Sequence, residues 1–404
     1  MKIIYRSILL LAITIALAGV YTSCSEDNLA NNGEPMIKYI RVSDPASADS
    51  LLIGGFQDNM IVIVGENLQD AREIWFNDQQ GPLVSTFITS KTIFTVVPTE
   101  VPKEITNKMK IVFGNGKTLE HDFFVAISRP EIVSMDFEFA QPGEVTTLRG
   151  NFFYEPLTVT FSGGAVGEVI KVEENSIEFK VPSGAQPGPI TVKTAFGEST
   201  SSLRYRDNRA FLNYDNLTAS GSWRAGTMGS TGGLDGNYLI LKGVLDKNQR
   251  TEDYSGGGYV SEFWSKANGR PEGNLFTGLP DTYVLKFEAK VVNWYGSYLN
   301  MCFTPWDHNN NNGEYWGNIN ARAIWGPWDS GTTPYKTKDW ITVTIPLTEF
   351  KYQIASDASG NVEYQAMKFD PSKTGGLTFW MVGSPLANAS PVEVYFDNVR
   401  IVPK

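Results

Sequence analysis

The sequence contains few of the side chains that most catalytic and metal centres use. Its 404 residues include only two cysteines, Cys24 and Cys302, and two histidines, His121 and His308. Catalytic triads and zinc sites need several such residues brought together, and no spacing here supports one. The loop at residues 307–313 departs from a calcium-binding loop because its Gly comes one place late. We therefore expect no metal and no cofactor.

Positive charge is also scarce. Lys and Arg total 34 against 44 Asp and Glu, which gives a formal net charge of -10. No basic block interrupts this excess of acidic residues. Because neutralisation of phosphates by Lys and Arg supplies most of the affinity for nucleic acids, the composition argues against nucleic acid as a partner.

Stretches that favour helices are missing as well. The chain has no heptad repeat and no long run of Ala, Leu, Glu and Lys, whereas it has 38 Gly and 21 Pro, and β-branched and aromatic residues are frequent. Such a composition favours short strands joined by turns. We predict an all-β chain, and its 404 residues are enough for two to four domains with a core each.

The first 23 residues are typical of an export signal. A positively charged start precedes an apolar run at residues 7–20, which is shorter than a membrane span. The small residue before Cys24 completes a pattern that resembles a bacterial lipoprotein signal, and residues 25–27 (Ser-Glu-Asp) resemble the acidic tag of outward-facing lipoproteins of the Bacteroidetes. We predict lipidation at Cys24, a tether at residues 24–35 and an outward-facing location on the outer membrane. Ordinary secretion is the alternative.

A repeat follows the tether. Three landmarks recur at offsets of 85, 85 and 84 residues: Gly65 and Gly150, Phe76 and Phe161, and Pro98 and Pro182. Such a constant offset indicates two copies of one module. Within each copy, short runs of alternating apolar and polar residues are separated by turn signals, which is the pattern of a β-sandwich.

The second copy carries recognisable motifs. It contains Gly-Asn-Phe-Phe at 150–153, Val-Thr-Phe at 159–161 and Gln-Pro-Gly-Pro-Ile-Thr-Val at 186–192. With these motifs it resembles an immunoglobulin-like IPT/TIG domain, and the first copy resembles one more loosely. The resemblance implies two Ig-like β-sandwiches, at 36–128 and 129–206, that act as spacers.

Composition changes near residue 207. Nine of the ten Trp lie beyond this point, and strand-like runs continue to the end of the chain. We predict that residues 207–404 form one larger, jelly-roll-like β-sandwich. Its closing run, residues 392–401, resembles the last strand of many carbohydrate-binding jelly rolls.

The most unusual stretch runs from Trp294 to Trp340, which contains six of the ten Trp among Asn, Gly, Asp and Pro. Flat aromatic rings presented by irregular backbone suit the faces of sugar rings, and polar side chains around them suit sugar hydroxyls. Trp340 opens a strand and is expected in the core. The candidate glycan-binding residues are Trp264, Trp294, Trp306, Tyr315, Trp316, Arg322, Trp325, Trp328 and Asp329. Local packing is the alternative for the aromatic residues.

The whole arrangement supports a second resemblance. A lipoprotein-like start, tandem TIG modules and a Trp-rich last domain, with Trp-Gly-Pro-Trp at 325–328 and a strand-like run at 336–347, resemble surface glycan-binding proteins of the Bacteroidetes, of the SGBP-B type. The resemblance implies a non-catalytic role in which the last domain binds xyloglucan or another β-glucan or hemicellulose. It further implies as partners the outer membrane, a SusC/SusD-like importer and surface glycosidases.

Two other function classes stay open. A glycosidase needs two carboxylates at a fixed separation, and Glu262, Asp307, Glu314 and Asp329 are available although none lies in a catalytic motif. A protein-binding adhesin would use the aromatic surface differently. If the glycan-binding interpretation holds, Trp294→Ala or Trp328→Ala is expected to weaken binding at least about tenfold without unfolding the protein.

Overall fold

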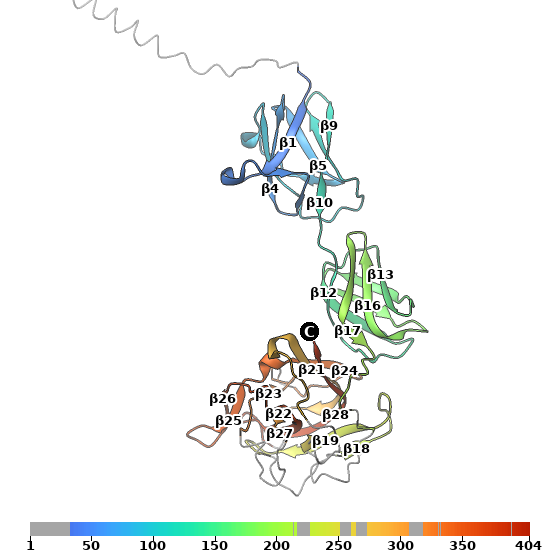
Figure 1. Ribbon diagram of the computed structural model, residues 1–404, viewed down its shortest axis with the longest axis vertical. Coiled ribbons are helices and arrows are strands. Elements are labelled where there is room, and N and C mark those ends of the chain that lie inside the picture. Colours follow the sequence, from blue (N-terminus) through green and yellow to red (C-terminus); the bar gives the residue numbers. More distant parts are fainter. Residues whose placement is uncertain are drawn as a thin grey trace, which may run out of the picture. The chain divides into compact units, whose positions relative to one another are not determined.

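The structure is a computed structural model, and it is almost entirely β (Figure 1). The described helical segments are 3-10 turns of three residues each, and none is long and apolar enough to span a membrane. The prediction of an all-β chain is confirmed. The residues that the structure describes are 33–212, 214–215, 227–250, 260–263, 273–306, 318–329, 331, 333–388 and 390–404. The predicted signal and Cys24 lie outside them.

The first compact unit, Met1–Ile127, contains one β-sandwich. One sheet has the order β2-β1-β4-β7: Leu51–Leu52, Met36–Val42, Met60–Glu66 and Thr92–Val96. The other has the order β6-β5-β8-β9: Gln79–Gly81, Ala71–Phe76, Lys108–Phe113 and Thr118–Asp122. A parallel pair joins β3 (Gly54–Phe56) and β10 (Phe124–Ala126). Ile63, Ile74 and Ile111 are fully buried between the sheets, as the alternating pattern requires.

The second unit, Ser128–Lys404, begins with another sandwich. One sheet has the order β11-β12-β15-β14: Glu131–Met135, Val145–Asn151, Ser176–Lys180 and Glu168–Glu173. The other has the order β13-β16-β17: Leu157–Ser162, Gln186–Thr194 and Gly197–Tyr205. The buried ring of Phe161 packs edge-on against Tyr205, with 4.9 Å between ring centroids. Two Ig-like sandwiches therefore precede the last domain, as predicted.

The repeated glycines have a common structural cause. Gly65 and Gly150 each lie opposite a bulge in the first strand of their sandwich. A Cβ atom on Gly65 would lie 2.1 Å from the carbonyl oxygen of Met36, and one on Gly150 would lie 1.8 Å from that of Glu131. No side chain fits at either position. The sequence repeat therefore reflects a repeated close approach of two strands.

The last domain is a larger sandwich of two antiparallel sheets (Figure 1). The five-stranded sheet has the order β18-β19-β28-β21-β24: Thr227–Gly229, Tyr238–Leu245, Ser390–Pro403, Tyr283–Trp294 and Ile341–Pro346. The six-stranded sheet has the order β20-β27-β22-β23-β25-β26: Val260–Phe263, Gly376–Gly383, Ser297–Thr304, Arg322–Trp325, Tyr352–Ser356 and Val362–Ala366. A single apolar core that includes Phe287, Met301 and Phe396 fills the space between them. The predicted third sandwich is thereby confirmed.

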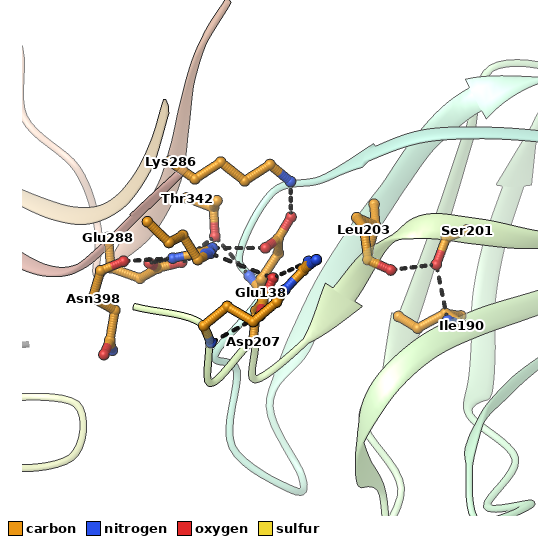
Figure 2. A network of polar contacts seen from close by, with 11 residues as sticks. Glu138, Ile190, Ser201, Leu203, Asp207, Lys286, Glu288, Thr342 and Asn398 are labelled. Atoms are coloured by element: carbon orange, nitrogen blue, oxygen red, sulfur yellow. Dashed lines mark hydrogen bonds and ion pairs between the residues drawn. The ribbon is translucent and has the colours of Figure 1, made fainter. Parts of the chain in front are cut away.

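Buried charges connect the second Ig-like sandwich to this last domain (Figure 2). Arg400 on β28 is fully buried, and its guanidinium lies 2.7 Å from a carboxylate oxygen of Glu138 and 2.6 Å from one of Glu288. Lys286 on β21 pairs with the other oxygen of Glu138. Burial raises the pKa of Glu288, and the charge of Arg400 acts in the opposite direction. The network joins Glu138 of the second Ig-like sandwich to strands β21 and β28 of the last domain.

Backbone contacts reinforce the same junction. The amide of Glu138 donates to the Thr342 hydroxyl at 2.8 Å, and the amide of Thr342 donates to the Asp136 carbonyl at 2.9 Å. The amide of Arg206 donates to the Glu138 carbonyl at 2.8 Å. Because the charged and backbone groups of Glu138 are satisfied from several directions, the two sandwiches are held in one arrangement.

We predict that Arg400→Met destabilises the second unit by about 3–5 kcal/mol, because it leaves Glu138 and Glu288 buried without their cation. The measurement is urea unfolding followed by circular dichroism. Arg149→Met is the matched control, since Arg149 pairs with Asp136 at the surface, where both side chains are about half exposed. Its loss is expected to stay within about 1 kcal/mol. Equal losses in the two variants would contradict a special role for the buried network.

Candidate functional site

The six-stranded sheet has a second buried face on the side away from the core. Alternation along β22 sends Leu299, Met301 and Phe303 into the core and their neighbours to the opposite side. On that opposite side, a separate apolar cluster forms, against which Tyr364 packs: Cys302, Ile354, Val362, Trp380 and Val382. We call this side the outer face.

Arg322 on β23 is the centre of the polar groups on the outer face. Its side chain is fully buried, and its two terminal nitrogens donate to the amide oxygens of Asn300, at 3.2 Å, and Asn318, at 3.0 Å. The guanidinium lies 5.3 Å from the ring centroid of Trp380, a cation–π contact. Asn300 in turn donates to the Tyr364 hydroxyl at 2.9 Å. Amide, guanidinium and phenol groups are thus fixed next to an indole.

Two threonine hydroxyls add hydrogen-bonding capacity to the outer face. Thr304 on β22 and Thr378 on β27 are fully buried, and neither hydroxyl has a hydrogen-bond partner in the described part of the chain. Thr378 lies directly opposite Cys302 in the strand register, so it is a diagonal neighbour of Thr304. A hydroxyl can both donate and accept, and a buried one without a partner costs free energy. Both hydroxyls therefore belong to the buried polar layer of the outer face and not to its exposed surface.

Tyrosine rings line the edge of the outer face. Tyr298 is half-buried and donates to the carboxylate of Asp329 at 2.8 Å, and its ring centroid lies 6.1 Å from that of Tyr364. Burial, together with Asp329, raises the pKa of Tyr298, and burial raises the pKa of Tyr364 to about 12. Both phenols stay protonated at neutral pH: the Tyr298 hydroxyl donates to Asp329, and the Tyr364 hydroxyl, which accepts from Asn300, still has its own hydrogen to donate.

Two of the expected platform residues lie in the core instead. Trp294 is fully buried and Trp328 is 3% exposed, and both belong to the apolar core between the sheets. Both indole nitrogens donate to the Ser297 carbonyl, at 2.8 Å and 2.5 Å. Rings without an exposed face cannot stack on a sugar, so the expectation for these two residues is wrong. The turn residues around them do mark bends, but these bends fold the rings inward.

The other aromatic residues of the Trp-rich region and Trp264 differ in where the structure places them. Trp325 is half-buried, and its ring lies among the core rings of Trp294, at 5.0 Å, and Phe287, at 5.5 Å, which argues against a platform role. Trp340 is 5% exposed, so its expected burial is confirmed. Trp306 is half-buried at the turn after β22 and stays a candidate. The remaining predicted residues lie outside the described part: Trp264, Tyr315 and Trp316.

The predicted polar residues lie on different parts of this region. Arg322 is part of the outer face, and Asp329 is an exposed residue at its edge. Sequence reasoning missed Asn300, Tyr364 and Trp380. The signal for Asn300 was its place between Leu299 and Met301 in a strand-like run, which directs it to the side opposite the core.

Fold and site together define a class of protein: a β-sandwich binding domain carried on Ig-like modules, with aromatic, amide and guanidinium groups on one face. A family model described as "Surface glycan-binding protein B xyloglucan binding domain" matches residues 205–403. All the residues of the outer face lie within this match. The last domain therefore belongs to that family.

Similar proteins agree with this assignment. The crystal structure of the surface glycan-binding protein PbSGBP-B from Prevotella bryantii is similar, with 25% identity and a TM-score of 0.75, over 92% of this chain and 99% of that one. An IPT/TIG domain-containing protein from Bacteroides ovatus is 32% identical over 146 residues, 35% of this chain and 29% of that protein. The match thus spans less than a third of that relative's length. The membership therefore rests on the last domain, whose family name points to a cell-surface location, and the likeness to PbSGBP-B extends over nearly the whole chain.

We predict that Trp294→Ala and Trp328→Ala each destabilise the second unit by about 3–5 kcal/mol, because each removes a large ring from the core. The measurement is urea unfolding followed by circular dichroism. Trp75→Ala is the control, since Trp75 is half-buried on the first sandwich and its loss is expected to cost less. Stable variants that lose glycan binding would instead restore the platform role of these two rings.

Proposed function

We propose that this chain binds a plant-type polysaccharide, xyloglucan or another β-glucan or hemicellulose, on the outer face of the six-stranded sheet, and that it does not cleave it. The observation that carries the proposal is the position of Arg322, Asn300 and Tyr364 on one face within the region that matches a xyloglucan-binding-domain family. Of the glycan-binding residues predicted from the sequence, Arg322 and Asp329 are kept as part of this site, and Trp306 is kept as a candidate beside it.

The chemistry of the outer face suits a neutral sugar. Half-buried Tyr298 and Tyr364 offer ring surface for the apolar faces of pyranose rings. Buried Asn300 holds the Tyr364 hydroxyl in place, and the exposed carboxylate of Asp329 can accept hydrogen bonds from sugar hydroxyls. If each stacked ring contributes roughly 1–3 kcal/mol, by analogy with base stacking, two or three contacts give micromolar to millimolar affinity after the cost of association. A polymer with many equivalent sites compensates for such weak binding.

A non-catalytic role fits the composition of the outer face. Glycosidases use two carboxylic groups about 5–9.5 Å apart, one of them with a raised pKa. The face described here is built from Arg, Asn, Thr, Tyr and Trp, and the carboxylate of Asp329 at its edge accepts a hydrogen bond from Tyr298. Within the described residues, no group of three His, Cys, Asp or Glu is arranged to hold a metal ion. Hydrolysis of the same glycan is the competing function.

We further propose that Cys24 carries a lipid anchor and that the protein faces outward from the outer membrane. The lipoprotein-like signal at residues 1–23 and the acidic residues after Cys24 support this location. The two Ig-like sandwiches then separate the binding domain from the anchor along the chain. Captured polysaccharide is passed to neighbouring surface glycosidases and to a SusC/SusD-like importer.

The direct test is affinity electrophoresis of the full chain in gels that contain different polysaccharides. We expect xyloglucan, or a related β-glucan or hemicellulose, to retard the wild-type protein. Tyr298→Ala and Tyr364→Ala are each expected to lower the affinity by about tenfold, because each removes one sugar-facing ring. Tyr395→Ala is the matched control, since Tyr395 is also half-buried but lies on the five-stranded sheet, and it is expected to bind as the wild type does.

Four outcomes would contradict the proposal. No retardation of a folded protein by any polysaccharide would exclude glycan binding. Release of reducing ends on incubation with the ligand would indicate a glycosidase. Binding to a protein partner that soluble glycan does not compete for would indicate an adhesin. Loss of affinity in Tyr395→Ala alone would move the site to the other sheet.

A further inference from the structure

A cavity of about 440 Å³ lies at the junction of the second Ig-like sandwich and the last domain. It is lined from one side by residues 136–137 and 144–147 and from the other by residues 338–341, which lead into β24. Its volume lies within the usual range for small-molecule sites, which occur preferentially where two domains meet. This cavity is separate from the outer face, because β24 belongs to the five-stranded sheet.

The lining combines aromatic and polar groups. Phe137 is half-buried, and Trp340 forms another part of the wall, its indole nitrogen bonded away from the cavity to the Gly232 carbonyl at 3.2 Å. Alternation along β12 directs Val145 and Thr147 to the side opposite the buried Leu148, outside the core of the Ig-like sandwich. The cavity therefore offers ring surface together with a hydroxyl.

The charges at the cavity balance. Asp136 pairs bidentately with Arg149, at 2.8 Å and 2.7 Å, and Asp339 pairs with Lys290 at 3.0 Å. Glu144 and Lys338 are exposed lining residues of opposite sign. With no excess of either charge, the lining favours a neutral ligand over an anion or a cation.

The walls of the cavity are held in place by the buried charge network. The backbone carbonyl of Asp136 accepts a hydrogen bond from the amide of Thr342. Two residues further on, the carboxylate of Glu138 forms ion pairs with Arg400 and Lys286 (Figure 2). A site formed by two domains binds well only when the domains do not have to be ordered on binding. The network supplies this preorganisation.

We propose that this junction cavity is a second glycan-binding site, which takes one or two neutral sugar units of the captured polysaccharide. Aromatic surface, a hydroxyl group and balanced charge are the features that suit a neutral, hydroxyl-rich ligand. The inference rests on the proposed function, since it concerns the same class of glycan. A second weak site on one rigid unit raises the avidity for a polymer without any change at the outer face.

The test is hydrogen–deuterium exchange of the full chain with and without a xylogluco-oligosaccharide at millimolar concentration. We expect exchange to slow at least about twofold in peptides that cover residues 144–147 and 338–341, and also in peptides of β22 and β27. Thr147→Arg fills the cavity and is expected to abolish the slowing at the junction while leaving it on β22 and β27. Thr158→Arg, an exposed position elsewhere on the same sandwich, is the matched control and is expected to behave as the wild type.

The outcomes separate this inference from the proposed function. Slower exchange on β22 and β27 alone would overturn the junction site and leave the outer face intact. Slower exchange at the junction that persists in Thr147→Arg would also overturn it, because the effect would not come from sugar in the cavity. No change in any peptide would overturn both the junction site and glycan binding.

Discussion

The buried ionic network around Arg400 is the constraint on which the rest of the second unit depends. A fully buried guanidinium is tolerated only when carboxylates and carbonyls surround it, and here Glu288 comes from the same domain while Glu138 comes from the preceding sandwich. Neither sandwich can satisfy these charges alone. β28, which carries Arg400, also lies between β19 and β21 in the five-stranded sheet, so the junction and the core of the last domain share one strand.

This constraint determines how binding surfaces are presented. The outer face lies on the six-stranded sheet, and the junction cavity adjoins the five-stranded sheet, so the two candidate surfaces belong to opposite layers of one sandwich. Both are preorganised: Arg322 and Asn300 by their mutual hydrogen bonds, and the cavity by the contacts of Glu138. Weak sugar contacts benefit most from such rigidity, because the protein side chains lose little conformational entropy when the polymer binds.

Local patterns in the sequence predicted the fold well. The offset between Gly65 and Gly150 identified the repeat because the same steric constraint, a carbonyl oxygen too close for any Cβ, acts in both copies. Period-two alternation identified the strands. Contacts between residues far apart in the chain left no such pattern: Glu138 and Arg400 are 262 residues apart, and nothing in the residues around either one indicates its partner.

The site was predicted less well, for a physical reason. Turn-forming neighbours distinguish a bend from a strand, but they do not show which way a ring points after the bend, and Trp294 and Trp328 point into the core. Residues on both sides of the six-stranded sheet are buried. The strand positions of Asn300 and Trp380 therefore cannot be distinguished from core positions by the hydrophobic pattern. Arg322 was identified because it lies within the Trp-rich stretch, where polar side chains suited to sugar hydroxyls were expected.

The central claim is that glycan binds on the outer face of the six-stranded sheet, and its most direct test is a crystal structure of the full chain with a bound xylogluco-oligosaccharide. We predict that sugar rings contact Tyr298 and Tyr364 and that sugar hydroxyls are hydrogen-bonded by the Tyr364 hydroxyl and the Asp329 carboxylate. An oligosaccharide bound only elsewhere, on the five-stranded sheet or on the first sandwich, with the outer face unchanged, would contradict it.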